Sequence, residues 1–171
     1  MTSLPHPDNL HFEAVQGWLM LGDVASARAE FEQLSPEARA VPEVLELEWA
    51  MHAEAKAWSD AFAAAERLVQ TAPKRASGWI HRAYARRRMP GGGLAAAWEL
   101  LRPAYDAFPK NYLIAFNLAC YAAQMGRLDD AWDWLARAVA VGDRDAILQM
   151  ALADPDLEPL WPRIRAELET K

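Results

Sequence analysis

An internal repeat of about 34 residues is the feature that most constrains the fold of this chain. The clearest series places alanine at each position, and its intervals are 34, 36 and 34 residues. That series is Ala27, Ala61, Ala97 and Ala131, and two parallel series are Phe31, Ala65, Leu101 and Leu135, then Leu34, Leu68, Ala104 and Ala138. Self-similarity at this period is typical of a solenoid of stacked helical hairpins, because one hairpin cannot bury its apolar face alone. Such solenoids usually act by holding another protein or peptide.

The composition predicts a globular, all-α protein. Hydrophobic residues make up 53% and charged residues 25% of the 171 residues, a balance that excludes a disordered chain. Alanine, the best helix former, is abundant, whereas the β-branched residues are sparse and nothing alternates with period two. A net charge of −6 argues against a nucleic-acid backbone as the main partner.

The location that we expect is the reducing cytoplasm. Cys120 is the single cysteine, so an internal disulfide is excluded, and its apolar neighbours predict a small buried side chain rather than a reactive thiol. Residues 1–9 have neither the basic nor the apolar region of a signal peptide. No stretch approaches the ~20 apolar residues that span a bilayer, so we expect no membrane partner.

Glycine, proline and capping residues divide the chain into helical hairpins. The single domain, 1–171, is expected to hold repeats at about 8–41, 42–75, 76–111 and 112–145, followed by a C-terminal cap at 146–171. The expected helices are 9–21, 24–34, 42–55, 59–71, 77–88, 94–107, 112–125, 129–142, 146–153 and 156–169. A longer loop at Met89–Gly93 accounts for the single 36-residue interval. Pro103 falls inside a helix, where we expect a kink or an early end.

Several polar residues are expected at helix starts. Asp23, Asn111 and either Ser59 or Asp60 are predicted N-caps, because their side chains accept hydrogen bonds from the first backbone amides. Asp129 is followed by a second aspartate at a helix start, where negative charge favours the helix dipole.

The repeated pattern resembles the tetratricopeptide repeat. That family places bulky and small residues on the first helix, Gly at the turn, Ala, an aromatic or Leu and then Ala on the second helix, and Pro at the end. The fourth unit matches best, and the second unit has Lys56 where Gly is usual. The matching residues are Leu118, Ala119, Gly126, Ala131, Leu135 and Ala138 in the fourth unit, and Trp18, Gly22, Ala27 and Phe31 in the first. The resemblance implies an all-α, right-handed superhelical solenoid of antiparallel helix pairs, about four repeats plus a C-terminal capping helix.

The resemblance also implies a concave groove that is lined by the first helix of each pair and binds an extended peptide or a partner helix. One end of this groove would be acidic, the middle basic and the far end apolar, which favours a ligand of mixed charge. We expect Arg87 and Arg88 to hold an acidic group, and Phe12, Tyr84 and Phe116 to hold apolar side chains; alternatively, the arginines only solvate a helix face. The candidate partner-binding residues are Phe12, Gln16, Glu46, His81, Tyr84, Arg87, Arg88, Phe116 and Asn117.

One specific function of the family is not predicted. Some members bind the C-terminal carboxylate of chaperones through Lys, Asn and Arg at fixed groove positions, and this chain lacks that set of cations in either register. The corresponding residues are Phe12, Gln16, Leu47, Ser77 and His81, or, shifted by one repeat, Glu46, Ala50, His81, Leu113 and Asn117.

Catalysis, metal binding and cofactor binding find no support in the sequence. The four histidines have no metal-ligand spacing with one another or with Cys120. The glycines at 91–93 lack the Lys and Ser/Thr of a phosphate-binding loop and follow no strand. Most of the eight tryptophans fall at helical spacing and are expected in the core, with Trp161 in the C-terminal cap.

The sequence therefore predicts a non-enzymatic adaptor that binds a protein or peptide in its groove and needs no cofactor. A dedicated chaperone, resembling the acidic repeat chaperones of bacterial secretion systems, is an alternative. A further alternative is a homo-oligomeric structural protein in which another copy of the chain fills the groove or covers an end. An enzyme is the least supported class, because no cluster of perturbed titratable groups is predicted.

Overall fold

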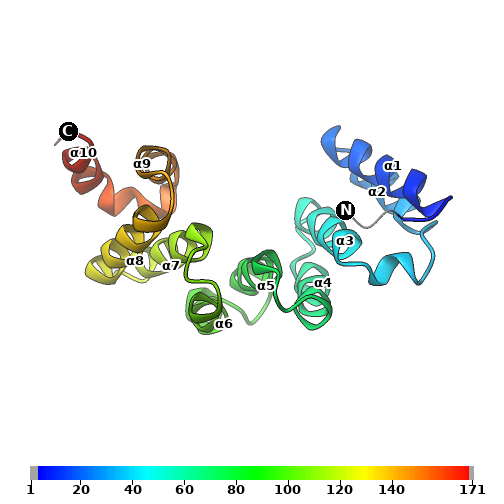
Figure 1. The fold of residues 1–171 in the computed structure, drawn as a ribbon, viewed down its shortest axis with the longest axis horizontal. Coiled ribbons are helices and arrows are strands. Elements are labelled where there is room, and N and C mark those ends of the chain that lie inside the picture. The colour runs from blue at the N-terminus through cyan, green and yellow to red at the C-terminus, as the bar shows by residue number, and fades with distance from the viewer. Residues whose placement is uncertain (1–3, 170–171) are drawn as a thin grey trace. The chain divides into compact units, whose positions relative to one another are not determined.

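The computed structural model describes residues 4–169, which form helices joined by turns and contain no strand (Figure 1). This confirms the all-α repeat fold that the sequence predicted. The helices are α1 (Asp8–Met20), α2 (Val24–Phe31), α3 (Pro42–Glu54), α4 (Trp58–Thr71), α5 (Ala76–Arg88), α6 (Leu94–Ala107), α7 (Tyr112–Gln124), α8 (Leu128–Val141), α9 (Arg144–Ala153) and α10 (Trp161–Glu169), with 3-10 helices η1 (Ala38–Ala40) and η2 (Pro155–Leu160).

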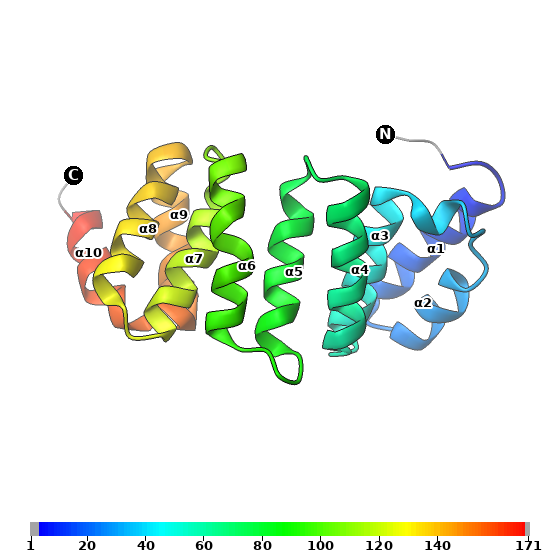
Figure 2. The same ribbon diagram turned by 90° about the horizontal axis from the view of Figure 1, so that it is seen from below.

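The chain divides into two compact units, and the boundary lies between Gly91 and Gly92. The first unit contains α1 to α5, in which α3 packs on α4 and α4 on α5 (Figure 2). The second contains α6 to α10, and its most extensive helix pair is α7 with α8. The sequence-based expectation of one domain over the whole chain stays a prediction.

The small residues that recur in the repeat are buried. Ala27, Ala61, Ala97 and Ala131 are all fully buried, as the repeat predicted. The larger residues four positions further on, such as Leu101 and Leu135, are also buried. Alanine at the close approach leaves room for the neighbouring backbone, and the larger side chains fill the space beside it.

The turns within three hairpins share one backbone conformation. Gly22, Lys56 and Gly126 have φ angles of 74°, 56° and 75°, all in the left-handed region. Glycine adopts this region without strain, whereas a residue with a Cβ does so at a cost. Lys56 therefore keeps the geometry of the repeat at the position where glycine is missing, and its side chain is exposed.

Two of the predicted helix caps are confirmed and one is wrong. Asp23 accepts a hydrogen bond from the Ser26 amide, and Asn111 accepts from the amides of the second and third residues of α7. Neither Ser59 nor Asp60 caps α4, because the turn after Lys56 already directs the chain into a helix that begins at Trp58. Asp60 lies instead in the first turn, where its charge favours the helix dipole.

Pro103 does not end its helix, so the prediction of an early end is wrong. Helix α6 continues to Ala107. Proline removes the hydrogen bond to the carbonyl group four residues earlier. That carbonyl belongs to Glu99, and because both Glu99 and Pro103 are exposed, water can take the place of the lost donor.

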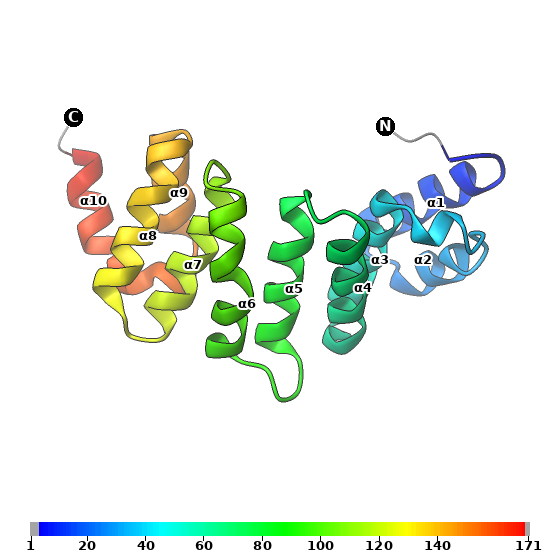
Figure 3. The same cartoon turned by 60° about the horizontal axis from the view of Figure 1, so that its bottom comes forward.

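The C-terminal segment differs from the single helix predicted over 156–169. The chain forms η2 first and turns into α10 at Trp161 (Figure 3). Pro159 lacks the amide hydrogen that an α-helix would need there. Leu157 and Ile164 are fully buried, and the segment packs against α7 and α9. The Trp161 indole donates to the Ala151 carbonyl at 2.9 Å, which places this tryptophan in the C-terminal cap as expected.

Among the described residues, none of the helices combines the length and the apolar character that crossing a bilayer requires.

Candidate binding surface

An aromatic cluster in the first unit joins α3, α4 and α5. The Trp49 ring stacks on the His81 ring with 3.8 Å between centroids and 13° between planes. The Trp49 indole also donates to the His81 carbonyl at 3.2 Å. Tyr84 meets both Trp49 and Trp58, with 5.9 Å between centroids in each case. Trp49, Trp58, His81, Tyr84 and Arg88 are called the aromatic cluster below. They are all half-buried, so part of each side chain faces solvent.

Arg88 is the charged member of the aromatic cluster. Its guanidinium carbon lies 3.5 Å from the Tyr84 ring centroid and 5.5 Å from that of Trp58. One of its N–H groups donates to the Tyr84 carbonyl at 3.2 Å. Within the described part of the chain, no carboxylate lies at ion-pair distance from Arg88. Contact with the rings holds the guanidinium in place without neutralising it, so the remaining donors keep their affinity for an anion.

His81 contributes a neutral ring to the cluster. Burial lowers the pKa of His81 to about 4, and the nearby Glu46 carboxylate only partly opposes this shift. The histidine is therefore uncharged near pH 7, where it offers an aromatic face and no positive charge.

The acidic end that the sequence predicted is partly neutralised by Arg75, a residue that the sequence pattern did not indicate. Arg75, at the N-terminus of α5, forms ion pairs with both Glu43 and Glu46. The hydroxyl of Ser77 donates to Glu46 as well. The hydrogen bond from Arg75 holds the pKa of Glu43 below its ordinary value. Glu46 is therefore part of an internal network rather than a free acidic side chain.

The other predicted groove residues lie in different surroundings. Phe12 packs against the core of the first unit, whereas Gln16 is exposed on α1. Arg87 lies on α5 beside Arg88 and is half-buried. In the second unit, Phe116 is only 5% exposed, so its ring lies in the core instead of lining an open groove. Its helix, α7, packs against α6, α8 and η2. Asn117 is half-buried and donates to the Leu113 carbonyl at 2.8 Å.

The tryptophans also divide between core and surface. Trp134 is buried as expected. Trp49 and Trp58, by contrast, are half-buried members of the aromatic cluster, and Trp18 is 37% exposed on α1. Helical spacing alone could not separate these cases, because it does not show which faces of a helix are covered.

Cys120 is buried, as predicted, but it has polar neighbours in the second unit. Its thiol donates to an Asp154 carboxylate oxygen at 3.6 Å, and the other oxygen of that carboxylate accepts from the Asp156 amide at 2.9 Å. Ligand atoms of these three residues lie within 4.8 Å of one another. Spacing along the sequence could not reveal this group, because 34 residues separate Cys120 from Asp154. Asp154 caps η2, and this capping accounts for its position.

Comparison with solved structures relates the fold to a known class. A thermophilic TPR protein from Thermus thermophilus superposes with a TM-score of 0.68 at 18% identity, over 94% of this chain and 96% of that chain. This chain therefore has the tetratricopeptide repeat fold, which confirms the resemblance inferred from the repeated residues. No protein-family model matches the sequence, and no curated protein matches it either.

Proposed function

We propose that this protein is a non-enzymatic adaptor that binds a peptide or protein segment through the aromatic cluster of the first unit. The observation that carries this proposal is the half-buried Arg88 guanidinium, which stacks on Tyr84 at 3.5 Å without a carboxylate partner among the described residues. Helical repeat proteins of this fold generally mediate protein interactions.

The ligand we propose carries an acidic group next to an aromatic or aliphatic side chain. A carboxylate would accept paired hydrogen bonds from Arg88, whose guanidinium is held against the Tyr84 ring. The exposed parts of Trp58 and Tyr84 would cover the neighbouring apolar side chain. His81, neutral near pH 7, adds no charge of its own to this contact.

The test is an array of short peptides in which acidic and apolar residues are varied independently, followed by solution titration of the best binder. Charged hydrogen bonds contribute about 1.5–3 kcal/mol, so we expect Arg88→Glu to weaken binding roughly tenfold to a hundredfold. Arg88→Lys keeps the charge but loses the planar fork, and it should weaken binding less than Arg88→Glu does.

Arg28→Glu is the matched control, because it makes the same charge change at an exposed position on α2. Equal loss in Arg28→Glu and Arg88→Glu would mean that net charge, not the aromatic cluster, controls binding. Binding that Arg88→Glu leaves unchanged would place the site elsewhere and overturn the proposal.

A further inference from the structure

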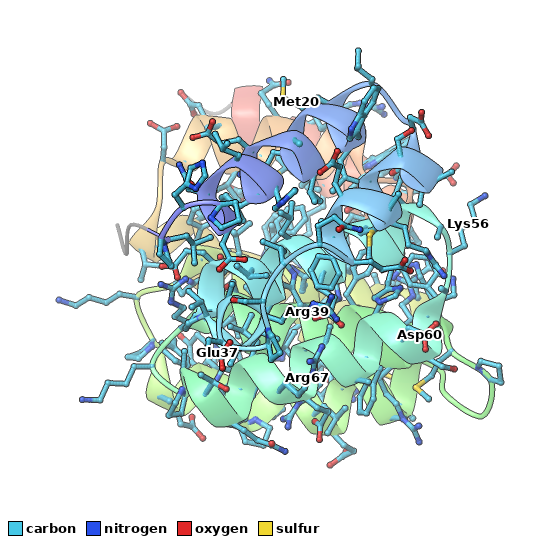
Figure 4. All side chains as sticks on the ribbon, turned by 90° about the vertical axis from the view of Figure 1, so that its right-hand side faces the viewer. Met20, Glu37, Arg39, Lys56, Asp60 and Arg67 are labelled. Carbon is cyan, nitrogen blue, oxygen red and sulfur yellow. The ribbon has the colours of Figure 1, made fainter. Side chains whose placement is uncertain are left out.

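Helix α1 and its C-cap residue, Leu21, carry the most exposed large apolar side chains of the described chain. Met20 is 89% exposed, Leu21 76% and Leu10 52%. Trp18 lies on the same helix and is also exposed. Met20 lies at the upper edge of the view onto this end of the first unit (Figure 4). Exposed apolar residues that gather in this way mark an interaction surface more often than scattered ones do.

The opposite side of α1 already serves the core. Val15 is fully buried there, and Phe12 and Leu19 pack beside it. A helix that is apolar on both sides is usually covered on both sides. The first unit therefore leaves the outer side of α1 uncovered.

The outer residues of α1 follow the spacing of a helix-pairing seam. Leu10, Ala14, Gly17 and the C-cap residue Leu21 are separated by four, three and four residues, and Leu21 still has a helical backbone conformation, which places all four along one stripe. These four residues are called the α1 seam below.

Gly17 supports the interpretation of the α1 seam as a contact surface. Glycine inside a helix costs about 1 kcal/mol relative to alanine. Its backbone is ordinary helix, and a Cβ added there would meet nothing within 4 Å. No contact within the described chain thus requires glycine, whereas the close approach of another helix would.

We propose that the α1 seam pairs with the α1 seam of a second copy of this chain, in an antiparallel, two-fold symmetric dimer. The spacing of four, three and four is the same in both chain directions. In one antiparallel register, each seam residue therefore lies opposite a seam residue of the partner. In that register Leu10 lies opposite the partner's Leu21, and Ala14 lies opposite the partner's Gly17. The large residues then close the two ends of the contact, and the small ones let the backbones approach at its centre.

Charge favours a second copy as the occupant. The α1 seam contains no charged residue, and two of the polar groups on the same helix, Asp8 and His11, are already engaged within the first unit. Asp8 accepts from Ser35, and His11 pairs with Glu30 at 2.9 Å. In the antiparallel register the flank of α1 that carries Glu13 adjoins the flank of the partner that carries Met20, and the two Glu13 side chains are offset by about five positions along the helix axes, so they are not directly opposite one another.

The size of the seam sets the strength of the contact. Exposed patches on monomers reach about 300–600 Å². Two such faces bury roughly 1,000 Å² together, which is near the lower limit for a specific interface. We therefore expect a weak dimer whose population rises with concentration. This contact is separate from the aromatic cluster, so it goes beyond the proposed adaptor function and does not depend on it.

The first test measures the mass of the full chain by sedimentation equilibrium over a range of concentrations. We expect a monomer–dimer equilibrium, and Leu21→Glu should weaken the dimer roughly tenfold or more by burying an unpaired carboxylate. Leu128→Glu is the matched control, because it makes the same change at an exposed leucine of the second unit and should leave dimerisation unchanged. Circular dichroism verifies that both variants stay folded. A monomer at every concentration, or equal dimerisation of wild type and Leu21→Glu, would overturn the proposal.

The second test measures the register. Ala14→Cys and Gly17→Cys are prepared as separate variants of the full chain and then mixed under mild oxidation. The antiparallel register predicts that the mixed disulfide forms faster than either homodimeric disulfide. Faster formation of the Ala14→Cys homodimer would indicate parallel pairing, and equal rates for all three would indicate random collision; either result contradicts the register.

Discussion

At the scale of single residues, the turn at Lys56 departs from the chemistry that the repeat favours. Its φ of 56° lies in the left-handed region, which Gly22 and Gly126 also adopt at the equivalent turns. The Cβ of lysine is crowded there, whereas glycine would be relaxed. Replacing the lysine also makes the unfolded chain more flexible, which offsets part of the gain.

We therefore expect Lys56→Gly to raise the free energy of unfolding by about 0.5–1 kcal/mol. Urea denaturation followed by circular dichroism measures the change. Gly126→Ala is the reciprocal variant and should lower the free energy of unfolding by about 1 kcal/mol. If Lys56→Gly destabilises the protein, the side chain of Lys56 contributes a contact that outweighs the backbone strain.

Asp8 is a second residue with a measurable consequence. Its carboxylate is buried at the start of α1 and accepts from both the amide and the hydroxyl of Ser35, each at 2.7 Å. These hydrogen bonds lower the pKa of Asp8 in the folded state. A lowered pKa means that the stabilisation is complete above the unfolded pKa, about 3.9, and is lost as the pH falls through the folded value.

We expect Asp8→Asn to be less stable than wild type at pH 7, with the difference shrinking as the pH falls below about 4. Denaturation curves at several pH values measure this, with the exposed Asp133→Asn as the control. A difference that stays constant down to acid pH would show that the charge of Asp8 is not what stabilises the contact with Ser35.

At the scale of the helices, the packing of α7 on α8 depends on a small residue at the contact. Ala131 is fully buried, and α7 and α8 form the most extensive helix pair of the second unit. Ala131→Leu should overpack this contact and lower the free energy of unfolding by about 1–3 kcal/mol. Ala140→Leu, on the exposed side of α8, should change it by less than about 0.5 kcal/mol. Chemical denaturation measures the stability of both variants. Equal stabilities would show that Ala131 does not lie at the close contact between α7 and α8.

The helices themselves could be predicted from the sequence because their limits are local. Glycine ends a helix through a left-handed turn, and proline excludes the hydrogen bonds of an interior position. Where two influences compete, the local signals were insufficient. At Pro159 the hydrophobic spacing of a helix continues through a proline, and the chain resolves this by forming η2 before α10.

The surroundings of the candidate site residues could be predicted only in part, because exposure and pairing depend on distant residues. The placement of His81, Tyr84 and Arg88 on one helix followed from their spacing, and these residues do share the aromatic cluster. The neutralisation of Glu46 depends on Arg75, which is 29 residues away in the chain. Helix α7, which carries the buried Phe116, packs against η2, an element that has no counterpart in the repeat.

At the scale of the whole molecule, the first unit has a core of its own. Its buried residues include Val15, Ala27, Val44 and Met51, all within α1 to α3. In repeat proteins, stability is approximately a sum over repeats and their nearest neighbours. A segment that contains several neighbouring hairpins can therefore fold without the remainder of the chain.

We expect a fragment of residues 1–91 to be helical and to unfold cooperatively in urea. Circular dichroism measures both properties, and the intact chain is the reference. A fragment with little helix, or one that loses its helix gradually with denaturant, would show that the unit defined by its contacts is not an independent folding unit.

The shared left-handed turns have a consequence for how such a chain gains or loses length. Residues 23–56 form one period that starts just after Gly22 and ends at Lys56, where the backbone has returned to the same conformation. A duplication or deletion of that period would rejoin the chain between two matching conformations and leave the remaining turns intact. Unequal recombination at these turns therefore changes the length by whole hairpins, so that related chains are expected to differ in steps of 34 residues.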